Sequence, residues 1–405
     1  MRGSVPMNFS EEMIAAVQTR SISNIETRFW TSDVEAVIGI MLVLLILGTI
    51  NVFSSSFILA ESEYETPYFF LKRHLANMII GVSAFLTCVF VDYHRWRNWM
   101  ILTLGGTIIA LILVLIVGQE INGAKRWLNL VVFTFQPAEI AKLIAIMIEA
   151  SYLAMKVQQK KLADIRDNYP FWIILVMGAL TELEPDMGTM CIIVGIPIIM
   201  NIVAGLHEKQ LIALPAFLVV GTIILFLLQP YRIARLKVAF DPWSDAQNVG
   251  YQTVQSLSAI GSGELTGMGL GIGVSKYEYL PEAHTDFAFA IFCQENGFLG
   301  AMFVFMLFAA LAIYSARVAN KAPDSYGQIL SLGIMILIIG QAIANLLMVG
   351  GMMPVVGVPL PFISYGGTSL IVSMAAMGIL VNIGRMGEMK RQKKRSTSKE
   401  DVNPF

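Results

Sequence analysis

The sequence predicts an all-α polytopic membrane protein with about ten transmembrane helices and with both termini in the cytoplasm. Hydrophobic residues make up 56% of the 405-residue chain and charged residues only 14%, whereas soluble domains contain roughly 25% charged residues. Mean hydropathy is +0.67. Apolar runs of about 20 residues, the length at which a helix crosses a bilayer, recur along the chain. A soluble fold of this length could not bury so much apolar surface, so lipid must solvate much of it.

The apolar runs divide the chain into three parts. Residues 1–33 are polar and contain neither the apolar core nor the cleavage site of a secretory signal, so we predict a cytoplasmic N-terminal segment. Residues 34–384 form the predicted transmembrane domain, and the basic and then polar residues 385–405 form a cytoplasmic tail. The apolar runs lie at 34–57, 69–91, 99–118, 138–156, 171–183, 188–206, 211–228, 287–316, 328–350 and 365–384.

Positive charges predict which side each loop faces. An even number of spanning helices puts both chain ends on one side, and the basic tail marks that side as cytoplasmic by the positive-inside rule. The tail cations are Lys390, Arg391, Lys393, Lys394 and Arg395. Further cations fall on the same side, at Arg95, Arg97, Lys156, Lys160, Lys161, Arg166, Lys209, Arg317 and Lys321.

Another set of cations falls on the outer side, against the positive-inside rule. Its members are Lys72, Arg73, Lys125, Arg126, Arg232, Arg235, Lys237 and Lys276. Some of them could extend their long side chains to lipid phosphates. As a set they favour an anionic ligand at the outer leaflet. The formal net charge of −1 argues against general attraction to nucleic acid, so no nucleic-acid partner is predicted.

Two predicted outer segments are long. The first runs over 119–137, and the second over 229–286, between the seventh and eighth apolar runs. Long ordered loops are more often functional than connective. The second segment contains a glycine-rich stretch at 261–273, which could cradle a phosphate. Re-entrant or surface-lying backbone is at least as good an interpretation, because no strand of a dinucleotide-binding unit precedes it.

The apolar run at 138–156 contains charges that a bilayer makes costly. Glu139, Lys142 and Glu149 lie on one face of a helix at 100° per residue. A charge at mid-bilayer costs about 2.5–3.5 kcal/mol on insertion scales, so such groups face the bundle interior and pair. Glu139 and Lys142 could form a clamp that fixes helix packing, or they could border a polar substrate cavity.

Three acids cluster between the fifth and sixth apolar runs, at Glu182, Glu184 and Asp186. Pro185 ends the fifth helix, and Asp186 could simply cap the sixth. As a group the acids could instead bind a divalent cation or orient basic residues of the outer loops.

Asp286 is the strongest local candidate for chemistry, because it lies where the long outer loop enters the eighth apolar run. Near a helix N-terminus the macrodipole favours an ionised carboxylate, which suits a base or a metal ligand. An N-capping role has about equal support. We predict that His284 is a hydrogen-bonding partner rather than a metal ligand, because no second histidine has ligand spacing.

Several long motifs resemble those of the SEDS family (shape, elongation, division and sporulation proteins), and its FtsW branch most closely. They are GAKRWLNL (123–130), FQPAEIAKL (135–143), EPDMGT (184–189), DPWSDAQNVGYQTVQSLSAIGSG (241–263), YLPEAHTDFAFA (279–290) and MPVVGVPLPFISYGGTS (353–369). The resemblance covers nearly the whole membrane portion. It departs at Gln294, where the family usually has an acid, so no role is carried to that position.

The resemblance implies a peptidoglycan glycosyltransferase. Such enzymes polymerise lipid II, a disaccharide-pentapeptide on undecaprenyl pyrophosphate, into β-1,4 glycan strands at the outer face of the bacterial cytoplasmic membrane. They work beside a class B penicillin-binding transpeptidase and other divisome proteins, and the FtsW branch implies the division septum. The aspartate of the family's HTDF segment is catalytic, and it corresponds to Asp286. A divalent cation, Mg or Mn, could neutralise the leaving pyrophosphate, and Asp286 could be one of its ligands.

The motifs and the outer cations together indicate a substrate site. Its predicted members are Arg126, Trp127, Glu139, Lys142, Asp186, Arg232, Arg235, His284, Ser364 and Tyr365. Two other functions remain open: a lipid II flippase with a cavity lined by Glu139 and Lys142, and a non-catalytic scaffold that activates the transpeptidase.

Overall fold

The computed structural model describes residues 32–121, 123–129, 134–227, 229–277 and 280–400, so the predicted N-terminal segment lies almost wholly outside the described residues. Most elements are helical. The helices are α2 (Asp33–Tyr64), α3 (Phe69–Phe90), α4 (Tyr93–Asn98), α5 (Met100–Val117), α6 (Pro137–Gln158), α7 (Tyr169–Leu183), α8 (Met187–Ala204), α9 (Glu208–Leu227), α10 (Pro230–Phe240), α11 (Tyr251–Ser262), α12 (Ala288–Asn320), α13 (Ser325–Val349) and α14 (Gly367–Glu400). Short 3-10 helices are η1 (Ile165–Asp167), η2 (Pro242–Asp245) and η3 (Val274–Lys276).

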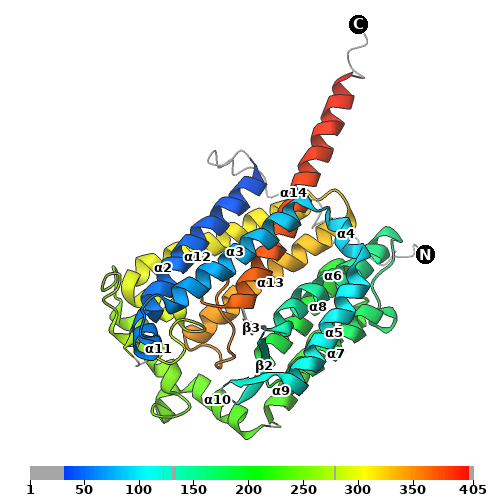
Figure 1. Cartoon of the computed structure of the whole chain (residues 1–405). Coiled ribbons are helices and arrows are strands. Elements are labelled where there is room, and N and C mark those ends of the chain that lie inside the picture. Colours follow the sequence, from blue (N-terminus) through cyan, green and yellow to red (C-terminus); the bar gives the residue numbers. More distant parts are fainter. Residues whose placement is uncertain (1–31, 122, 130–133, 228, 278–279, 401–405) are drawn as a thin grey trace, which may run out of the picture.

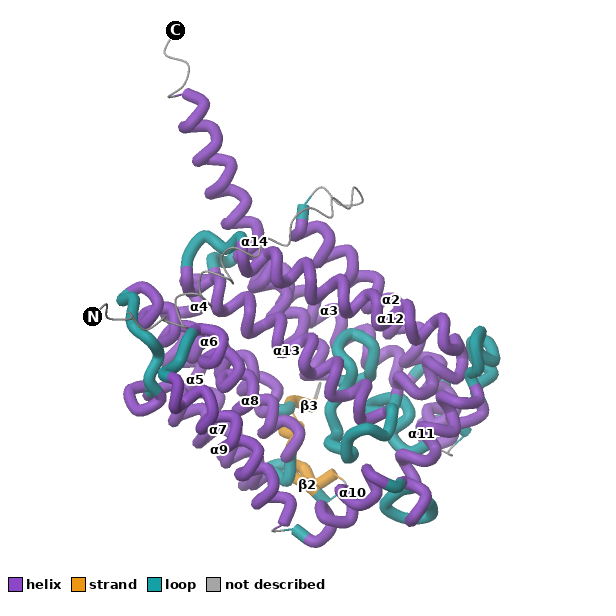
Figure 2. Tube along the Cα trace, turned by 180° about the vertical axis from the view of Figure 1, so that it is seen from behind, coloured by secondary structure: helices purple, strands orange, loops and turns teal. Residues whose placement is uncertain are grey.

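The long helices run side by side between two ends of the molecule (Figure 1). One end carries α4 and the basic C-terminal part of α14, and we call it the inner end on the positive-inside rule. The opposite, outer end carries β2, α10 and α11. Seen from behind, α5 to α9 lie on one side of the molecule and α2, α3 and α12 on the other, with α13 between them (Figure 2).

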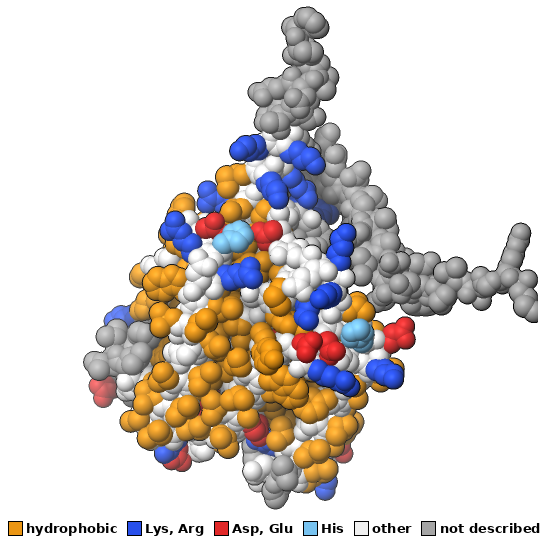
Figure 3. All heavy atoms as spheres, turned by 90° about the vertical axis from the view of Figure 1, so that its right-hand side faces the viewer, with side chains coloured by type: hydrophobic (Ala, Val, Ile, Leu, Met, Phe, Trp, Pro, Cys, Tyr) orange, Lys and Arg blue, Asp and Glu red, His pale blue; other side chains and the backbone are white. Residues whose placement is uncertain are grey.

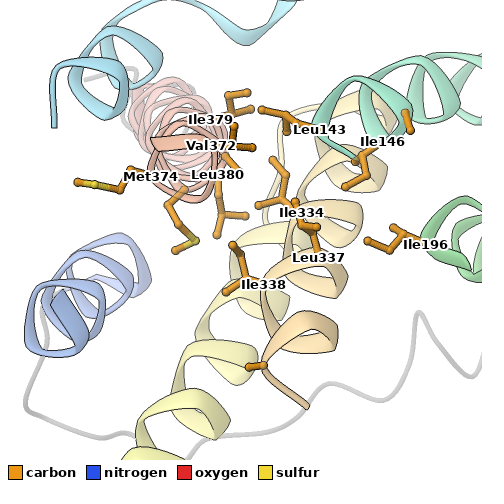
Figure 4. Close-up of a cluster of buried hydrophobic side chains, with 14 of the residues drawn as sticks. Leu143, Ile146, Ile196, Ile334, Leu337, Ile338, Val372, Met374, Ile379 and Leu380 are labelled. Carbon is orange, nitrogen blue, oxygen red and sulfur yellow. The ribbon is translucent and has the colours of Figure 1, made fainter. Parts of the chain in front are cut away.

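A continuous hydrophobic core joins the two groups of helices around α13. Figure 4 shows this cluster, in which side chains of α6 and α8 face those of α13 and α14. The labelled residues are Leu143, Ile146, Ile196, Ile334, Leu337, Ile338, Val372, Met374, Ile379 and Leu380. Any polar side chain that α13 carries toward its outer end is therefore surrounded by protein.

The outside of the molecule is apolar across its middle. Figure 3 shows apolar side chains covering the centre of one face, with charged side chains gathered toward its ends. Ile101, Ile116 and Ile212 are 82%, 71% and 78% exposed. Exposing so wide an apolar surface to water would cost free energy, whereas lipid solvates isoleucine side chains favourably. The predicted class of helical membrane protein is thus confirmed.

The predicted number of spanning helices is supported only in part. Among the described residues, eight helices have the length and composition of a membrane span: α2, α3, α5, α8, α9, α12, α13 and α14. The other two apolar runs form α6, which carries Glu139, Lys142 and Glu149, and α7, which has only 15 residues. The count of ten stays a prediction.

Polar residues between the apolar runs start several helices. Ser32 accepts a hydrogen bond from the backbone of Glu35 at the start of α2. Asp186 caps α8 in the same way, through the backbone N–H of Thr189 at 3.2 Å, so the capping alternative for Asp186 is confirmed. Pro137 occupies the first turn of α6, where its missing N–H costs nothing.

The eighth apolar run, at 287–316, does not form one straight helix. Within α12, Gly297 has φ 65° and ψ −167°, which are not helical values. The rings of Phe289 and Phe305 lie 6.0 Å apart, although a continuous helix would separate residues sixteen positions apart by about 24 Å. Residues 288–296 therefore fold back on the rest of α12, and we call them the half-helix. Glycine at 297 permits this turn.

The two outer segments contain more structure than the sequence indicated. Three strands of the first segment form a small antiparallel sheet in the order β1 (Gln119–Ile121), β2 (Ala124–Asn129) and β3 (Thr134–Phe135), a departure from the all-α prediction. The glycine-rich stretch packs its backbone on the half-helix: a Cβ at Gly263 or Gly267 would lie 2.2 Å from the carbonyl oxygen of Cys293 or Glu295. Close packing, rather than a phosphate cradle, explains these two glycines.

Candidate active site

A cavity of about 350 Å³ opens at the outer end of the molecule. Its walls come from β2, the α7–α8 turn, α10 and the segment between α13 and α14. Three of the outer cations line it together, Arg126, Arg232 and Arg235. The other lining residues are Gly123, Ala124, Pro185, Met187, Gly188, Pro354, Val355 and Val356. The predicted gathering of outer positive charge is therefore found around one cavity.

Neighbouring polar groups hold the three arginines in place. Arg126 donates from Nε to the carbonyl of Glu184 at 3.2 Å and from Nη2 to the carbonyl of Pro185. Arg232 pairs with the carboxylate of Glu182 at 2.5 Å. Arg235 donates to the carbonyl of Val355 at 3.1 Å. Glu182 thus orients a basic residue through its carboxylate, which was one of the alternatives for this cluster, whereas Glu184 contributes only its backbone carbonyl.

Asp286 lies next to the cavity wall. The half-helix begins two residues after it, and a Cβ on Gly357 would be 3.4 Å from Asp286 Oδ2. Residues 354–356, immediately before Gly357, line the cavity. Asp286 does not cap α12, whose N-cap is Phe287 without a side-chain hydrogen bond. Within the part of the chain that the structure describes, the Asp286 carboxyl makes no hydrogen bond or ion pair, so it is uncommitted.

The surroundings of Asp286 oppose the ionised state that the sequence suggested. Although the side chain is partly exposed, burial by surrounding protein raises the pKa of its carboxyl to about 7, and the charges of Glu282 and Asp186 raise it further while Arg126 lowers it. The pKa of the neighbouring Glu184 is also raised, to about 8, by burial and by Asp186. The helix macrodipole does not outweigh desolvation at this position.

The pair formed by Glu139 and Lys142 is buried and does not line the cavity. Lys142 Nζ lies 2.8 Å from Glu139 Oε2 and donates to Gln341 Oε1 at 2.9 Å. Both charged side chains are at most 5% exposed. The structure thus shows the packing clamp. It places neither residue at the described cavity.

Lys276 was predicted among the cations available to an outer ligand, and this prediction is wrong. Its Nζ lies 2.7 Å from Glu295 Oε1, and both side chains are at most 1% exposed. Ser54 of α2 also donates to the Glu295 carboxylate at 2.6 Å. Lys276 therefore anchors the end of the half-helix and cannot meet a ligand.

In the described part of the chain, the Asp286 carboxyl makes no hydrogen bond or ion pair with the remaining predicted residues, His284, Tyr365, Ser364 and Trp127. The His284 ring packs against Phe70 and Tyr365, with ring centroids 4.5 and 5.6 Å apart, and burial lowers the pKa of His284. Ser364 makes a turn by accepting from the backbone of Leu360 at 3.0 Å. Trp127 lies half-buried on β2.

The acids do not form a preformed metal cage. Across the described ranges, no group of three or more His, Cys, Asp or Glu residues could hold a metal ion. Asp186 is already occupied, because it caps α8 and accepts from Gln136 Nε2 at 3.0 Å.

Sequence reasoning missed three buried amides near Asp286, namely Asn51, Gln341 and Asn345. They are 3%, 3% and 0% exposed. Each donates to a backbone carbonyl, of Ala288, Pro359 and Asp286 respectively. The sequence did contain a signal for them, because an amide inside an apolar run is costly in a membrane. Asn51 is such an amide, and Gln341 and Asn345 lie four residues apart and therefore on one face of α13.

Comparison with known proteins identifies relatives over most of the chain. Residues 35–388 match the FtsW/RodA/SpoVE family, described as cell cycle proteins. Stage V sporulation protein E of Bacillus subtilis (strain 168) is 39% identical over 350 residues, covering 85% of this chain and 95% of that protein. A probable peptidoglycan glycosyltransferase FtsW of Geobacter sp. (strain M18) is 36% identical, covering 86% and 95%. A chain in a solved peptidoglycan synthase complex, studied for the structural coordination of polymerization and crosslinking, gives a TM-score of 0.69 at 25% identity and covers 87% of this chain and 97% of that one.

The buried clamp in α6 predicts a stability effect. Lys142→Met leaves the Glu139 charge buried without its partner, which should lower the free energy of unfolding by roughly 3–5 kcal/mol. Glu139→Leu combined with Lys142→Met should recover most of the loss. Thermal unfolding of the detergent-solubilised protein measures both, with the exposed outer Lys72→Met as the control. If Lys142→Met keeps the stability of the wild type but binds substrate more weakly, Lys142 contacts the ligand instead of stabilising the fold.

Proposed function

Because the chain belongs to the FtsW/RodA/SpoVE family of cell cycle proteins, we propose that it is a peptidoglycan glycosyltransferase that polymerises lipid II into β-1,4 glycan strands at the outer face of the bacterial cytoplasmic membrane. The observation that carries this proposal is the placement of an uncommitted carboxyl group, Asp286, beside a cavity lined by three arginines. Relatives named as probable peptidoglycan glycosyltransferases support it.

The reaction needs a base and an anion site. Asp286 would supply the base, and the arginine-lined cavity would supply the anion site. Asp286 takes the proton from the acceptor sugar's 4-hydroxyl as that oxygen attacks the anomeric carbon of the donor. The bond from this carbon to the pyrophosphate oxygen breaks, and the electron pair leaves with the undecaprenyl pyrophosphate. A single in-line displacement converts an α-linked donor into a β-linked product.

The arginines suit the leaving group. Guanidinium groups bind phosphate oxygens through two parallel charge-assisted hydrogen bonds. Arg126, Arg232 and Arg235 are positioned before substrate arrives by carbonyl groups and by Glu182. Pre-positioned positive charge stabilises the developing pyrophosphate without reorganisation, which is the way such sites lower a barrier. The cavity volume of about 350 Å³ suits a headgroup's diphosphate and one sugar better than a whole lipid II molecule.

A divalent cation, Mg or Mn, is part of the proposal. Mg²⁺ in phosphate-transfer sites is usually held by one or two carboxylates together with substrate phosphates, so a protein cage is not required. Asp286 is the free carboxylate that fits this arrangement. When bound, the cation would neutralise charge on the leaving pyrophosphate.

We further propose a class B penicillin-binding transpeptidase as partner, together with other divisome proteins, and a place at the division septum. The likeness to a chain of a peptidoglycan synthase complex supports a polymerase acting beside a crosslinking enzyme. The match to a family of cell cycle proteins and a relative named for sporulation support septal synthesis.

A lipid II flippase is the alternative function, with a scaffold as a third. Intramembrane charges favoured the flippase, but Glu139 and Lys142 are tied to each other and to Gln341 rather than open to a passage. The uncommitted state of Asp286 favours chemistry over a scaffold.

Removal of the Asp286 carboxylate should abolish polymerisation. Protein purified with its transpeptidase partner should make glycan strands from labelled lipid II and Mg²⁺. Asp286→Ala and Asp286→Asn should lower the rate by about 10²–10⁴-fold, because general-base catalysis contributes that much. Glu120→Gln, which changes an exposed outer carboxylate on β1, is the matched control and should keep wild-type activity.

The same assay separates the three functions. Full strand synthesis by Asp286→Ala would remove Asp286 from the mechanism. Transfer of lipid II between leaflets without strand formation by the wild type would support the flippase. Retained stimulation of the transpeptidase by Asp286→Ala, with no polymerisation by either variant or wild type, would support the scaffold.

The cavity arginines would hold the diphosphate both in the bound donor and in the leaving group, so their loss should weaken substrate affinity as well as slow the reaction. Arg126→Gln and Arg235→Gln each remove a charge-assisted contact worth about 1.5–3 kcal/mol, so each should raise KM for lipid II roughly tenfold or more. Lys72→Gln neutralises an outer cation that does not line the cavity, and its KM should equal that of the wild type. Equal effects of all three substitutions would show general attraction to lipid rather than a specific anion site.

Activity should depend on pH through the ionisation of Asp286. Either proposed role of Asp286, base or cation ligand, needs the carboxylate form, so kcat/KM should rise with pH through an apparent pKa near 7 and then level off. Glu282→Gln removes a negative charge that raises this pKa, so the midpoint should move to lower pH. Arg126→Gln should move it to higher pH. Shifts in the opposite directions, or a flat profile over about pH 5–9, would contradict the assignment.

A further inference from the structure

The carboxyl group of Asp286 has no hydrogen-bonding partner among the described residues, so its position depends on its backbone. That backbone leads directly into the half-helix, which begins at Ala288. Whatever fixes the start of the half-helix therefore fixes the carboxylate against the arginine-lined cavity.

Two buried asparagines bind the backbone at this point from two different helices. Asn345 of α13 donates from Nδ2 to the carbonyl of Asp286 at 2.8 Å. Asn51 of α2 donates from Nδ2 to the carbonyl of Ala288 at 3.0 Å. The half-helix is thus attached on one side to α2 and on the other to α13.

Asn345 also ties Asp286 to the cavity wall. The same Nδ2 donates to the carbonyl of Val358 at 2.7 Å. Val358 follows Gly357, which lies beside the Asp286 carboxyl, and residues 354–356 line the cavity. One amide group therefore sets the separation between Asp286 and the wall of the anion site.

Each amide has a cost to the fold as well as a benefit. Both lie in apolar helices, and their Oδ1 atoms are buried without a hydrogen-bond partner among the described residues. A buried polar atom without a partner is costly. An apolar residue of similar volume would avoid that cost, but it could not bind the two carbonyls.

We propose that Asn345 and Asn51 are positioning residues that hold Asp286 at the arginine-lined cavity by binding the backbone at the start of the half-helix. This inference rests on the proposed function. The two residues act through Asp286 and touch neither substrate nor cation.

The test compares kcat and KM for lipid II polymerisation in three leucine variants, Asn345→Leu, Asn51→Leu and Asn382→Leu. Asn382 is the matched control, because its buried amide donates to the carbonyl of Val89 at 2.7 Å and accepts from the backbone of Tyr93, a contact of α4 at the inner end. All three variants should lower thermal stability. Only Asn345→Leu and Asn51→Leu should lower kcat, by on the order of 10–100-fold, since a displacement of about 1 Å can cost that much. KM should stay within about twofold, because the arginines are untouched.

Asn345→Ser supplies a second variant if the leucine substitution prevents folding. Its hydroxyl donates one hydrogen bond where the amide donates two, so kcat should fall between wild type and Asn345→Leu. The inference is overturned if both asparagine variants keep the wild-type kcat, or if Asn382→Leu lowers kcat of the folded enzyme equally. Activity of Asp286→Ala would defeat the proposed function instead, so the two failures are distinguishable.

Discussion

A polar or charged side chain inside a lipid-solvated helix bundle must find its partner within the protein, because neither lipid nor water is available to it. Most of the buried polar groups obey this constraint. Lys142 meets Glu139 and Gln341, and Lys276 meets Glu295 and Ser54. These contacts join helices that are far apart in sequence. The Lys142 contact ties α6 to α13, and the Ser54 contact ties α2 to the half-helix of α12.

Asp286 and the neighbouring Glu184 are exceptions to this constraint, since neither carboxyl group has a hydrogen-bond partner among the described residues, and Asp286 is the one that is partly exposed. Its carboxyl lies among protein atoms but has no hydrogen-bond partner in the described chain, and burial raises its pKa to about 7. A carboxyl group whose pKa lies near 7 is well suited to accept and release a proton at neutral pH. The nearby arginines, by contrast, are held by carbonyls and by Glu182. The site therefore combines a fixed anion-binding wall with a partly exposed carboxyl group, Asp286, that has no partner among the described residues.

The half-helix is the element that brings these parts together. The half-helix folds back at Gly297. It thereby places Asp286, two residues before its first residue, within the bundle rather than at the surface. Broken helices of this kind are tolerated in membrane proteins only where the surrounding protein satisfies the freed backbone groups. Asn51 and Asn345 do so at one end, and the glycine-rich stretch pairs with the other end through the carbonyls of Gln294 and Glu295.

The sequence by itself determined the helical membrane class, the predicted orientation and the motifs around Asp286, because these follow from apolar length, from the distribution of Lys and Arg, and from local residue order. Only the tertiary structure decided that Arg126, Arg232 and Arg235 share a cavity while Lys142 and Lys276 are buried in ion pairs. Cations look alike in a sequence, and their partners are set by contacts between distant segments. Asn51 and Ala288, for example, are 237 positions apart. No periodicity could reveal that contact, because it exists only once α2 and the half-helix pack together.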